Sequence, residues 1–377
     1  MRILQIGKFY PIKGGVEKVM YNIMIGLSHN GMYCDMLCAV AGKQKPGIIK
    51  INRYARLFCM STWLNLCGTM ISPAMIVMLW ELRRDYDVIH IHHPDPMAAL
   101  SLFLSGYKGR VVLHWHSDIL AQKLLLKFYR PLQWWLIKRA DAIVGTSPVY
   151  TEQSPWLKQV QDKITCIPIG IDEPVRNPQM ETRLRSKYSG KKIIFSLGRL
   201  VEYKGYRYLI KAAKYLDDEY VVLIGGAGPL KDHLQALIDK SRLTAKVELL
   251  GFIPDSDLPG YFGACDLFCL SSVQRTEAFG IVQIEAMSFR KPLVATRIKG
   301  SGVSWVNADK VSGLNVKPCN AKALADAIST ILSDKHLYNR LSEGAYRRYK
   351  EVFTKELMIE KCLSLYRHIL KKVSSDI

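Results

Sequence analysis

Short apolar runs alternate with longer amphipathic segments along most of the chain. Runs rich in Val, Ile and Leu predict buried strands, whereas segments with apolar residues three or four positions apart predict helices. The strands expected on this basis are residues 2–6, 33–40, 88–91, 111–115, 142–145, 164–167, 193–197, 221–224, 247–250, 267–270 and 293–296. Repeated alternation of strand and helix predicts an α/β fold with parallel sheets and helical crossovers.

One polar stretch, which contains Pro174 and Pro178, interrupts this alternation. It predicts an interdomain linker, and a chain of 377 residues is long enough for two hydrophobic cores. We therefore expect a first domain over residues 1–172, a second domain over 173–355 and a terminal segment over 356–377. The terminal segment is amphipathic, and its apolar face would stay exposed on a second domain that is already complete. We expect it to cross back and pack on the first domain.

The charge of the chain limits its partners. The net charge is +20, with 20 Lys and Arg against 10 Asp and Glu in residues 1–170 and 33 against 23 in residues 171–377. This excess favours anionic partners, namely phosphates, nucleic acid or an anionic membrane surface. No familiar nucleic-acid-binding motif is present, so we expect no nucleic-acid partner. The nine cysteines form no Cys-x-x-Cys pair, which predicts reduced core thiols in a cytoplasmic protein.

Residues 57–80 are uncharged and long enough to span a bilayer. They nevertheless contain several polar side chains, and Ser72-Pro73 predicts an N-cap followed by a first helical residue. We expect a core strand and a buried helix there. Residues 1–7 predict a first strand and not a signal peptide.

Residues 123–139 combine five cationic side chains with Phe128, Tyr129, Trp134 and Trp135. This mixture suits a membrane interface. Proline at position 131 predicts a division into two short helices. The alternative interpretation is an exposed basic helix pair with some core contacts.

Histidines occur at positions 90, 92, 93, 114 and 116, at the ends of two expected strands. Residues two apart on a strand share a face, so His90, His92, His114 and His116 could together bind a metal ion. The alternative is that most of them are hydrogen-bonded core residues. His116 follows a strand end, where open parallel sheets bind ligands, and is the best functional candidate. We expect Asp118 to orient it.

The stretch RTEAFGIVQIEAM, residues 275–287, places Glu277 and Glu285 on either side of an expected helix start at Gly280. At ~1.5 Å per helical residue the two carboxylates would lie roughly 10 Å apart, about the span of a nucleotide sugar. Arg199 and Lys204 flank an expected strand-to-helix loop, where two cations can clamp a diphosphate. The alternatives are solvated glutamates on an ordinary amphipathic helix and unspecialised surface cations.

Glycine-rich turns precede two expected helices, at Gly14-Gly15 and at residues 225–229. Such turns allow close approach of a phosphate, but neither has the full dinucleotide fingerprint. An NAD-type dehydrogenase therefore remains an alternative, as does a non-catalytic sugar-nucleotide binding protein. We interpret Asp255-Ser256-Asp257 as a helix cap and not as a metal-binding Asp-x-Asp motif.

In their order and spacing, the motifs resemble those of the retaining glycosyltransferases of family four, over nearly the whole chain. The motifs are GGVEK at 14–18, HHPDP at 92–96, HSD at 116–118, ADAIVGTSP at 140–148, IPIGID at 167–172, GRLVEYKG at 198–205, GGAGP at 225–229, GFIPD at 251–255 and EAFGIVQIE at 277–285. The continuation GSGVSWVNADKVSGLNV resembles members that assemble bacterial surface polysaccharides. The resemblance implies the GT-B architecture, in which two Rossmann-like domains with parallel sheets face each other across a cleft.

The resemblance also implies roles for individual residues. The implied catalytic residues are His116 beside the donor sugar, Arg199 and Lys204 at the donor diphosphate, and Glu277 at the sugar hydroxyls. The implied substrate-binding residues are Gly14, Gly15, Asp118, Gly226, Phe252, Ala278, Phe279, Gly280, Ile281 and Glu285, the last at the ribose hydroxyls. Fixed cations and helix amides can stabilise a leaving diphosphate, so we expect no metal and no other cofactor.

The implied reaction is transfer of a hexose from a nucleoside diphosphate sugar to a saccharide or lipid-linked acceptor, as in the biosynthesis of lipopolysaccharide O-antigen or capsule. A GDP-mannose-like donor is the first expectation and a UDP-hexose the second. We expect a cytoplasmic enzyme with peripheral contact to the anionic inner face of the cytoplasmic membrane. The candidate residues include no convincing general base or nucleophile, so we expect retention of the anomeric configuration.

Overall fold

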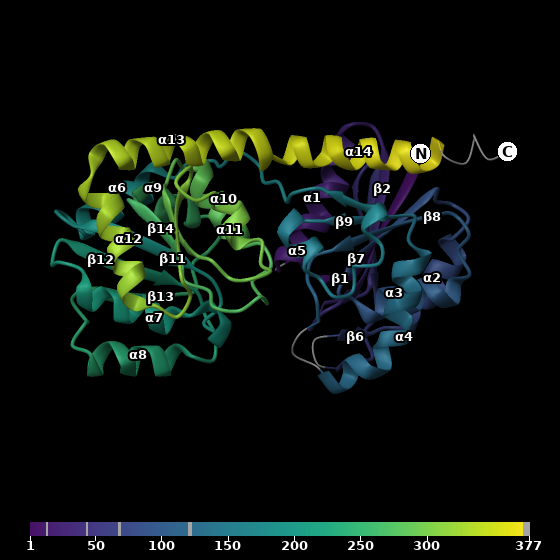
Figure 1. The fold of residues 1–377 in the computed structure, drawn as a ribbon. Coiled ribbons are helices and arrows are strands. Elements are labelled where there is room, and N and C mark those ends of the chain that lie inside the picture. The colour runs from purple at the N-terminus through teal and green to yellow at the C-terminus, as the bar shows by residue number, and fades with distance from the viewer. Residues whose placement is uncertain (13, 43, 67–68, 120–122, 372–377) are drawn as a thin grey trace. The chain divides into compact units, whose positions relative to one another are not determined.

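The computed structural model describes residues 1–12, 14–42, 44–66, 69–119 and 123–371. The chain divides into two compact units (Figure 1). The first consists of Met1–Gly170 together with the chain from Lys355 onward, and the second consists of Ile171–Thr354. These boundaries lie within two residues of those expected from the sequence.

The first unit is built on an eight-stranded sheet of order β10-β9-β8-β7-β1-β2-β4-β3, in which β3 and β4 alone are antiparallel neighbours. Its strands are β1 (Arg2–Tyr10), β2 (Tyr33–Val40), β3 (Gly47–Asn52), β4 (Ala55–Met60), β7 (Val88–His93), β8 (Arg110–Trp115), β9 (Ala142–Gly145) and β10 (Ile164–Cys166). Its helices are α1 (Gly15–His29), α2 (Pro73–Leu82), α3 (Pro96–Ser105), α4 (Lys123–Arg139), α5 (Pro148–Glu152), η1 (Gln161–Lys163) and α14 (Lys355–Lys371). Strands β5 (Leu64–Leu66) and β6 (Thr69–Ile71) form a separate antiparallel pair.

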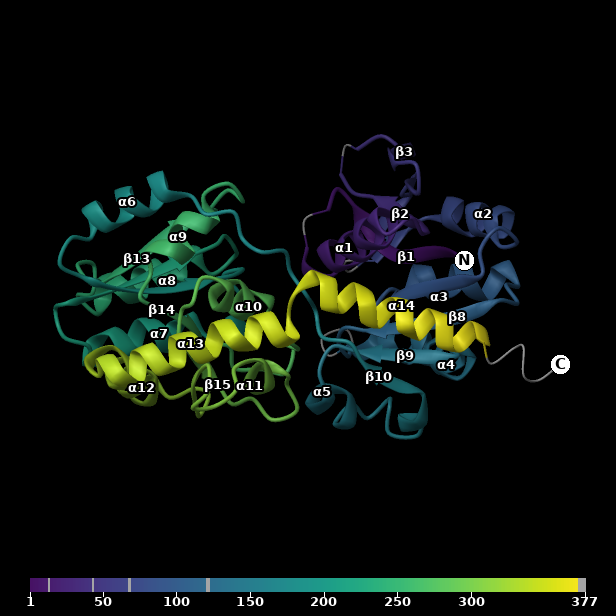
Figure 2. The same cartoon turned by 90° about the horizontal axis from the view of Figure 1, so that it is seen from above.

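Helix α14 packs on the first unit, against α1 (Figure 2). A Cβ atom added to Gly26 of α1 would lie 2.5 Å from the side chain of Ile359, so the two helices approach too closely there for a larger residue. The apolar side of α14, including Cys362 and Tyr366, is buried. This burial removes from water the apolar face that would otherwise be exposed.

The second unit is built on a six-stranded parallel sheet of order β13-β12-β11-β14-β15-β16. Its strands are β11 (Lys192–Leu197), β12 (Tyr220–Gly225), β13 (Val247–Gly251), β14 (Leu267–Leu270), β15 (Leu293–Thr296) and β16 (Gly313–Val316). Its helices are α6 (Pro178–Lys187), η2 (Glu202–Lys204), α7 (Tyr206–Ala212), η3 (Ala213–Tyr215), α8 (Lys231–Lys240), α9 (Leu258–Ala264), α10 (Ile281–Ser288), α11 (Val303–Val306), α12 (Ala321–Ser333) and α13 (Lys335–Val352). The predicted α/β class with parallel sheets is confirmed in both units.

Two local predictions are wrong. Residues 123–139 form the single helix α4, which continues through Pro131. A proline removes one backbone hydrogen bond, and the buried side chains of Tyr129 before it and Leu136 after it keep both halves packed on the unit. Helix α2 is not a buried helix, because Val77 and Trp80 are exposed while only one side of the helix meets the core. Within the described ranges, none of the helices has the length and apolar character that a bilayer span requires.

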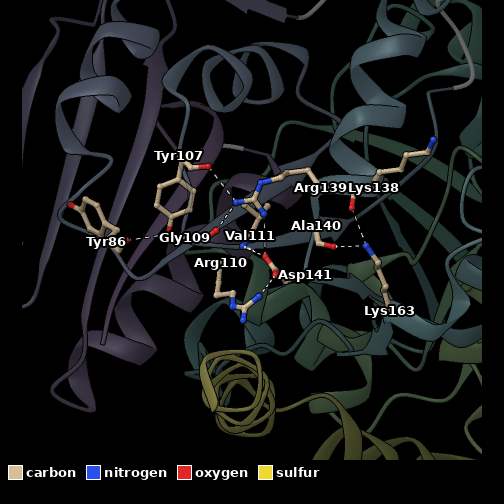
Figure 3. A network of polar contacts seen from close by, with 10 residues as sticks. All are labelled: Tyr86, Tyr107, Gly109, Arg110, Val111, Lys138, Arg139, Ala140, Asp141 and Lys163. Atoms are coloured by element: carbon tan, nitrogen blue, oxygen red, sulfur yellow. Dashed lines mark hydrogen bonds and ion pairs between the residues drawn. The ribbon is translucent and has the colours of Figure 1, made fainter. Parts of the chain in front are cut away.

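A network of polar contacts fastens the end of α4 to the amino-terminal edge of the sheet (Figure 3). Asp141 accepts from Arg110 at 2.5 Å and from Arg139 at 3.3 Å, and Arg139 also donates to the Gly109 carbonyl at 2.6 Å. Lys163 donates to two carbonyls at the end of the same helix. Arg139, one of the five cations expected at a membrane interface, therefore stabilises the fold instead.

Candidate functional site

The carboxyl ends of the strands in the second unit carry most of the predicted site residues. All six strands are parallel, so the residues that follow them meet at one edge of the sheet. Arg199 follows β11, Gly226 follows β12, Phe252 follows β13 and Glu277 lies in the segment after β14. The chain order of the strands reverses between β11 and β14, and open α/β sheets bind ligands at such a switch point.

Lys204 and Glu277 meet at this switch point. The Lys204 Nζ lies 2.5 Å from the Glu277 Oε2, and each side chain is only 10% exposed. The Ser272 hydroxyl donates to the same carboxylate oxygen at 2.8 Å, and the Ser301 hydroxyl donates to the Glu277 carbonyl. A buried ion pair depends on such additional hydrogen bonds, because both charges have lost most of their water.

Two glycines, Gly226 and Gly205, allow the loops of this edge to lie in close contact. A Cβ atom on Gly226 would lie 1.9 Å from the carbonyl oxygen of Gly198, and a Cβ atom on Gly205 would lie 2.3 Å from the carbonyl oxygen of Ser271. The φ angles of Gly226 and Gly205, +132° and +66°, also disfavour other residues. The glycine-rich turn after β12 thus serves contact between two loops, which weakens its interpretation as a dinucleotide fingerprint.

The remaining residues of this edge differ in their exposure. Arg199 is exposed, and its guanidinium makes no hydrogen bond or ion pair with the residues that the structure describes. Phe252 is 75% exposed. The side chain of Phe279 is buried and packs edge-on against Phe353, so only its backbone can meet a ligand. Ala278 is partly buried, and its carbonyl accepts from the Gly302 N–H at 2.8 Å.

Helix α10 begins beside these residues. Gly280 occupies its N-cap position with φ +76°, and Ile281 is its first residue. The first N–H groups of a helix have no partner within the helix and attract anions. Glu285, which is partly exposed, is the fifth residue of α10. The segment therefore presents backbone donors between two carboxylates, at Glu277 and Glu285.

The predicted cap at Asp255-Ser256-Asp257 is wrong in one respect. Asp257 occupies the N-cap position of α9, but its side chain accepts no hydrogen bond from the helix N–H groups. It accepts instead from the Ser256 hydroxyl at 3.2 Å.

The first unit has its own switch point, between β1 and β7. Gly14 is the N-cap residue of α1 and Gly15 is its first residue. A Cβ atom on Gly14 would lie 1.9 Å from the Oε2 atom of Glu17, whose side chain is buried. Glu17 was not among the predicted site residues.

Four buried histidines form a stack next to this switch point. The ring centroids are 4.7 Å apart for His90 and His92, 5.0 Å for His92 and His114, and 4.1 Å for His114 and His116. Burial lowers the pKa of His90, His92 and His116 well below the ordinary value, and lowers that of His114 to about 3. All four imidazoles are therefore neutral at physiological pH.

The stack does not have the geometry of a metal centre. Ligand nitrogens of His90, His92 and His114 lie within 4.8 Å of one another. However, these rings are stacked with interplanar angles of 10° to 28°, so their lone pairs run side by side and do not converge. Both nitrogens of His92 are also hydrogen-bonded already, to Gln5 and to His116. The geometry supports a neutral, hydrogen-bonded stack.

The expectation that Asp118 orients His116 is wrong. Asp118 Oδ1 accepts from the Trp115 indole at 2.9 Å and from the Ser154 hydroxyl at 2.7 Å. The His116 Nε2 instead lies 2.8 Å from the His92 Nδ1. Adjacency in sequence suggested Asp118, whereas the parallel register of β7 and β8 supplies the actual partner.

Comparison with known proteins places the chain among sugar-transferring enzymes. Residues 181–348 match the family described as Glycosyl transferases group 1, and residues 13–173 match Glycosyltransferase Family 4. The chain is 30% identical over 377 residues to O-antigen chain mannosyltransferase C of Escherichia coli, covering 99% of this chain and 100% of that one. It is 30% identical over 363 residues to D-rhamnosyltransferase WbpZ of Pseudomonas aeruginosa, covering 94% and 92%. Sucrose-phosphate synthase from Thermosynechococcus elongatus has a similar fold, with a TM-score of 0.79 at 19% identity over 99% of this chain and 100% of that one.

Proposed function

The chain belongs to glycosyltransferase family 4, as its motifs predicted, and from that premise we propose that it transfers a hexose from a nucleoside diphosphate sugar to a saccharide or lipid-linked acceptor in surface polysaccharide biosynthesis. The observation that carries the proposal is the buried Lys204–Glu277 pair at the switch point of the second sheet. A cation suited to phosphate and a carboxylate suited to sugar hydroxyls are the two groups that a nucleotide sugar requires. The relative that is a mannosyltransferase supports mannose as the transferred sugar. We propose a GDP-mannose-like donor as the first choice and a UDP-hexose as the second.

In this proposal the second unit stabilises the leaving group. Negative charge develops on the diphosphate as the glycosidic bond breaks. The exposed Arg199, the Lys204 ammonium and the first N–H groups of α10 supply positive charge and hydrogen-bond donors. Glu277 accepts hydrogen bonds from sugar hydroxyls, and Glu285 accepts them from the ribose. In this proposal these groups stabilise the leaving diphosphate and bind the sugar without a cofactor.

We further propose that the reaction retains the anomeric configuration. Inversion requires a general base opposite the leaving group, and double displacement requires a carboxylate nucleophile. Of the carboxylates predicted for the site, Glu277 is engaged by Lys204 and Ser272, and Asp118 is engaged by Trp115 and Ser154. Glu285 is assigned to the ribose. Departure of the diphosphate, with its own oxygen taking the acceptor proton, then leads to attack on the same face.

Peripheral contact with an anionic membrane is part of the same proposal. Helices α2, α3 and α4 are neighbours in the first unit. They expose the large apolar side chains Val77, Trp80, Phe103, Leu104 and Phe128. On α4, Lys127 and Arg130 are exposed, whereas the side chain of Lys123 lies outside the described residues. Exposed aromatic and basic side chains together favour the headgroup region of a bilayer.

The test is a donor panel. Purified protein is incubated with GDP- and UDP-sugars and with a saccharide or lipid-linked acceptor, and released nucleoside diphosphate is measured by a coupled assay. A donor that is turned over should also raise the melting temperature, because it binds the folded state. Release of no nucleoside diphosphate from any donor, or hydride transfer to NAD, would overturn the proposal.

A further inference from the structure

A series of hydrogen bonds between buried side chains leads from helix α14 to His116. Tyr366 of α14 places its hydroxyl 2.5 Å from the His90 Nδ1 and 3.4 Å from the Gln5 Nε2. The Gln5 Oε1 lies 2.5 Å from the His92 Nε2, and the His92 Nδ1 lies 2.8 Å from the His116 Nε2. Gln5, His92 and Tyr366 are buried. Gln5 and Tyr366 were not among the predicted site residues, and His92 was predicted only as a candidate metal ligand.

The chemistry at Tyr366 determines which atom donates and which accepts in this series of hydrogen bonds. A phenol is a better donor than a neutral imidazole, and an imidazole nitrogen is a better acceptor than a phenol oxygen. The Tyr366 hydroxyl therefore donates to His90, and its oxygen accepts from the amide of Gln5. This turns the carbonyl oxygen of Gln5 toward His92.

Each following step is then determined. A carbonyl oxygen can only accept, so the His92 Nε2 carries the proton and donates to Gln5. The His92 Nδ1 consequently has a free lone pair and accepts from the His116 Nε2. A neutral His116 with its proton on Nε2 has a bare Nδ1. Among the described residues, the structure gives the His116 ring a hydrogen bond through Nε2 only, which leaves Nδ1 to meet a ligand.

We propose that Gln5 and His92 are positioning residues that fix the tautomer of His116, so that its ring presents an unprotonated Nδ1 to a hydroxyl group of the substrate. The inference rests on the proposed function, because it gives His116 a task in binding a sugar. A ring held in this tautomer accepts a hydrogen bond from a hydroxyl and offers no donor to a carbonyl or phosphate oxygen at the same point. Burial lowers the pKa of His116, so protonation does not remove the acceptor near neutral pH.

The tautomer can be read without any assay of activity. Protein labelled with ¹⁵N-histidine is studied by long-range ¹H–¹⁵N correlation, and the His116 signals are assigned by their loss in His116→Asn. We expect the proton of both His92 and His116 on Nε2. A proton on the His116 Nδ1, or a charged His116 ring near pH 7, would overturn the proposal. A wild-type protein that shows the expected tautomer but transfers no sugar would refute the proposed function, whereas the roles of Gln5 and His92 in fixing the tautomer would stand.

Substitutions at Gln5 test whether the tautomer matters. In Gln5→Leu the acceptor for His92 is lost, and we expect a mixture of His116 tautomers together with a fall in donor kcat/KM of roughly tenfold or more, since loss of a tautomer-fixing partner has effects of that size or larger. Gln5→Glu keeps an acceptor oxygen and should retain the tautomer and most of the activity. His114→Phe is the matched control, because its ring stacks on His116 at 4.1 Å but lies outside the hydrogen-bonded chain. Equal losses of donor kcat/KM in Gln5→Leu and His114→Phe would indicate an effect of packing alone and would refute the proposal that Gln5 and His92 fix the tautomer. If Gln5→Leu does not fold, the spectrum of the wild-type protein still shows which nitrogen of His116 carries the proton and so tests the proposal.

Discussion

The histidine stack should make the first unit sensitive to mild acid, and His114 is the best place to measure the effect. Both ring nitrogens of His114 are buried and have no hydrogen-bond partner among the residues that the structure describes, and burial lowers the pKa of His114 to about 3. The unfolded chain has an ordinary histidine pKa of about 6.5. As the pH falls below about 6.5, the unfolded state binds a proton at this residue and the folded state does not. The free energy of unfolding therefore decreases as the pH falls.

The size of the effect follows from the two pKa values. At pH 5.5 the free energy of unfolding should be lower than at pH 7.5 by about 1.4 kcal/mol for this one residue. His90, His92, His93 and His116 are buried as well, with lowered pKa values. Each of them also loses stability as the pH falls, so the buried histidines together should cost the first unit more stability than His114 alone.

The perturbation is His114→Phe, which replaces the imidazole by a ring that cannot be protonated. The larger ring adds an overpacking cost of about 1–3 kcal/mol, but this cost does not vary with pH. Relative to wild type, the variant should therefore gain about 1.4 kcal/mol between pH 7.5 and pH 5.5.

Urea unfolding followed by tryptophan fluorescence measures the difference. The signal reports mainly on the first unit, because six of the seven tryptophans lie in it. His336→Phe is the control, since His336 is exposed on α13 in the second unit. If the free energies of unfolding of His114→Phe and wild type change equally between pH 7.5 and pH 5.5, burial does not lower the pKa of His114 as we infer.

Three further predictions concern the proposed function. Arg199→Ala and Lys204→Ala should each lose on the order of 3 kcal/mol of transition-state stabilisation, measured as donor kcat/KM. The control Lys192→Ala, which breaks an exposed ion pair with Glu219, should keep its activity. Near-normal turnover in both site variants would refute the proposed diphosphate site. Co-sedimentation of the protein with vesicles should rise with the content of anionic lipid and fall in the double variant Lys127→Glu, Arg130→Glu. The same change of charge at two exposed lysines of α8, residues 231 and 240, should have little effect. Co-sedimentation that does not depend on lipid charge would refute the proposed contact with an anionic membrane. Proton NMR of fresh product from an α-linked donor should show an α linkage, and a β linkage would contradict the proposed mechanism.

Much of the framework could be predicted from the sequence because buried parallel strands are apolar along their whole length. Strands β2, β9, β14 and β15 begin and end where the apolar runs do. Strands with exposed or mixed faces gave no such signal, and β3, β5, β6 and β16 were missed for that reason. Pro131 predicted a break that is not there. The loss of one backbone hydrogen bond at the proline is outweighed by the packing of the helix on both sides of it.

The site shows the same division between local and long-range information. Alternation along a strand correctly placed His90 beside His92 and His114 beside His116. It could not show which strands pair, so the contact between His92 and His116 was missed. Lys204 and Glu277 were each singled out by their motifs, but 73 positions separate them in the chain, and their ion pair depends on the order of strands in the sheet. The signal for Ser272 was its place directly after a buried strand, in a sequence with no other sign of function.

The Lys204–Glu277 pair suggests how diphosphate binding and sugar binding depend on each other. Without a ligand, each charge compensates the other at a place where both have lost most of their water. On the proposed function, a donor phosphate replaces the carboxylate as the partner of Lys204, so one anion is exchanged for another and the ammonium is never left uncompensated. Glu277 then keeps the Ser272 hydroxyl but has lost its cation, and the sugar hydroxyls supply the hydrogen bonds it needs. A free nucleoside diphosphate would satisfy Lys204 and leave Glu277 without them. The intact nucleotide sugar is therefore the ligand that satisfies both members of the pair.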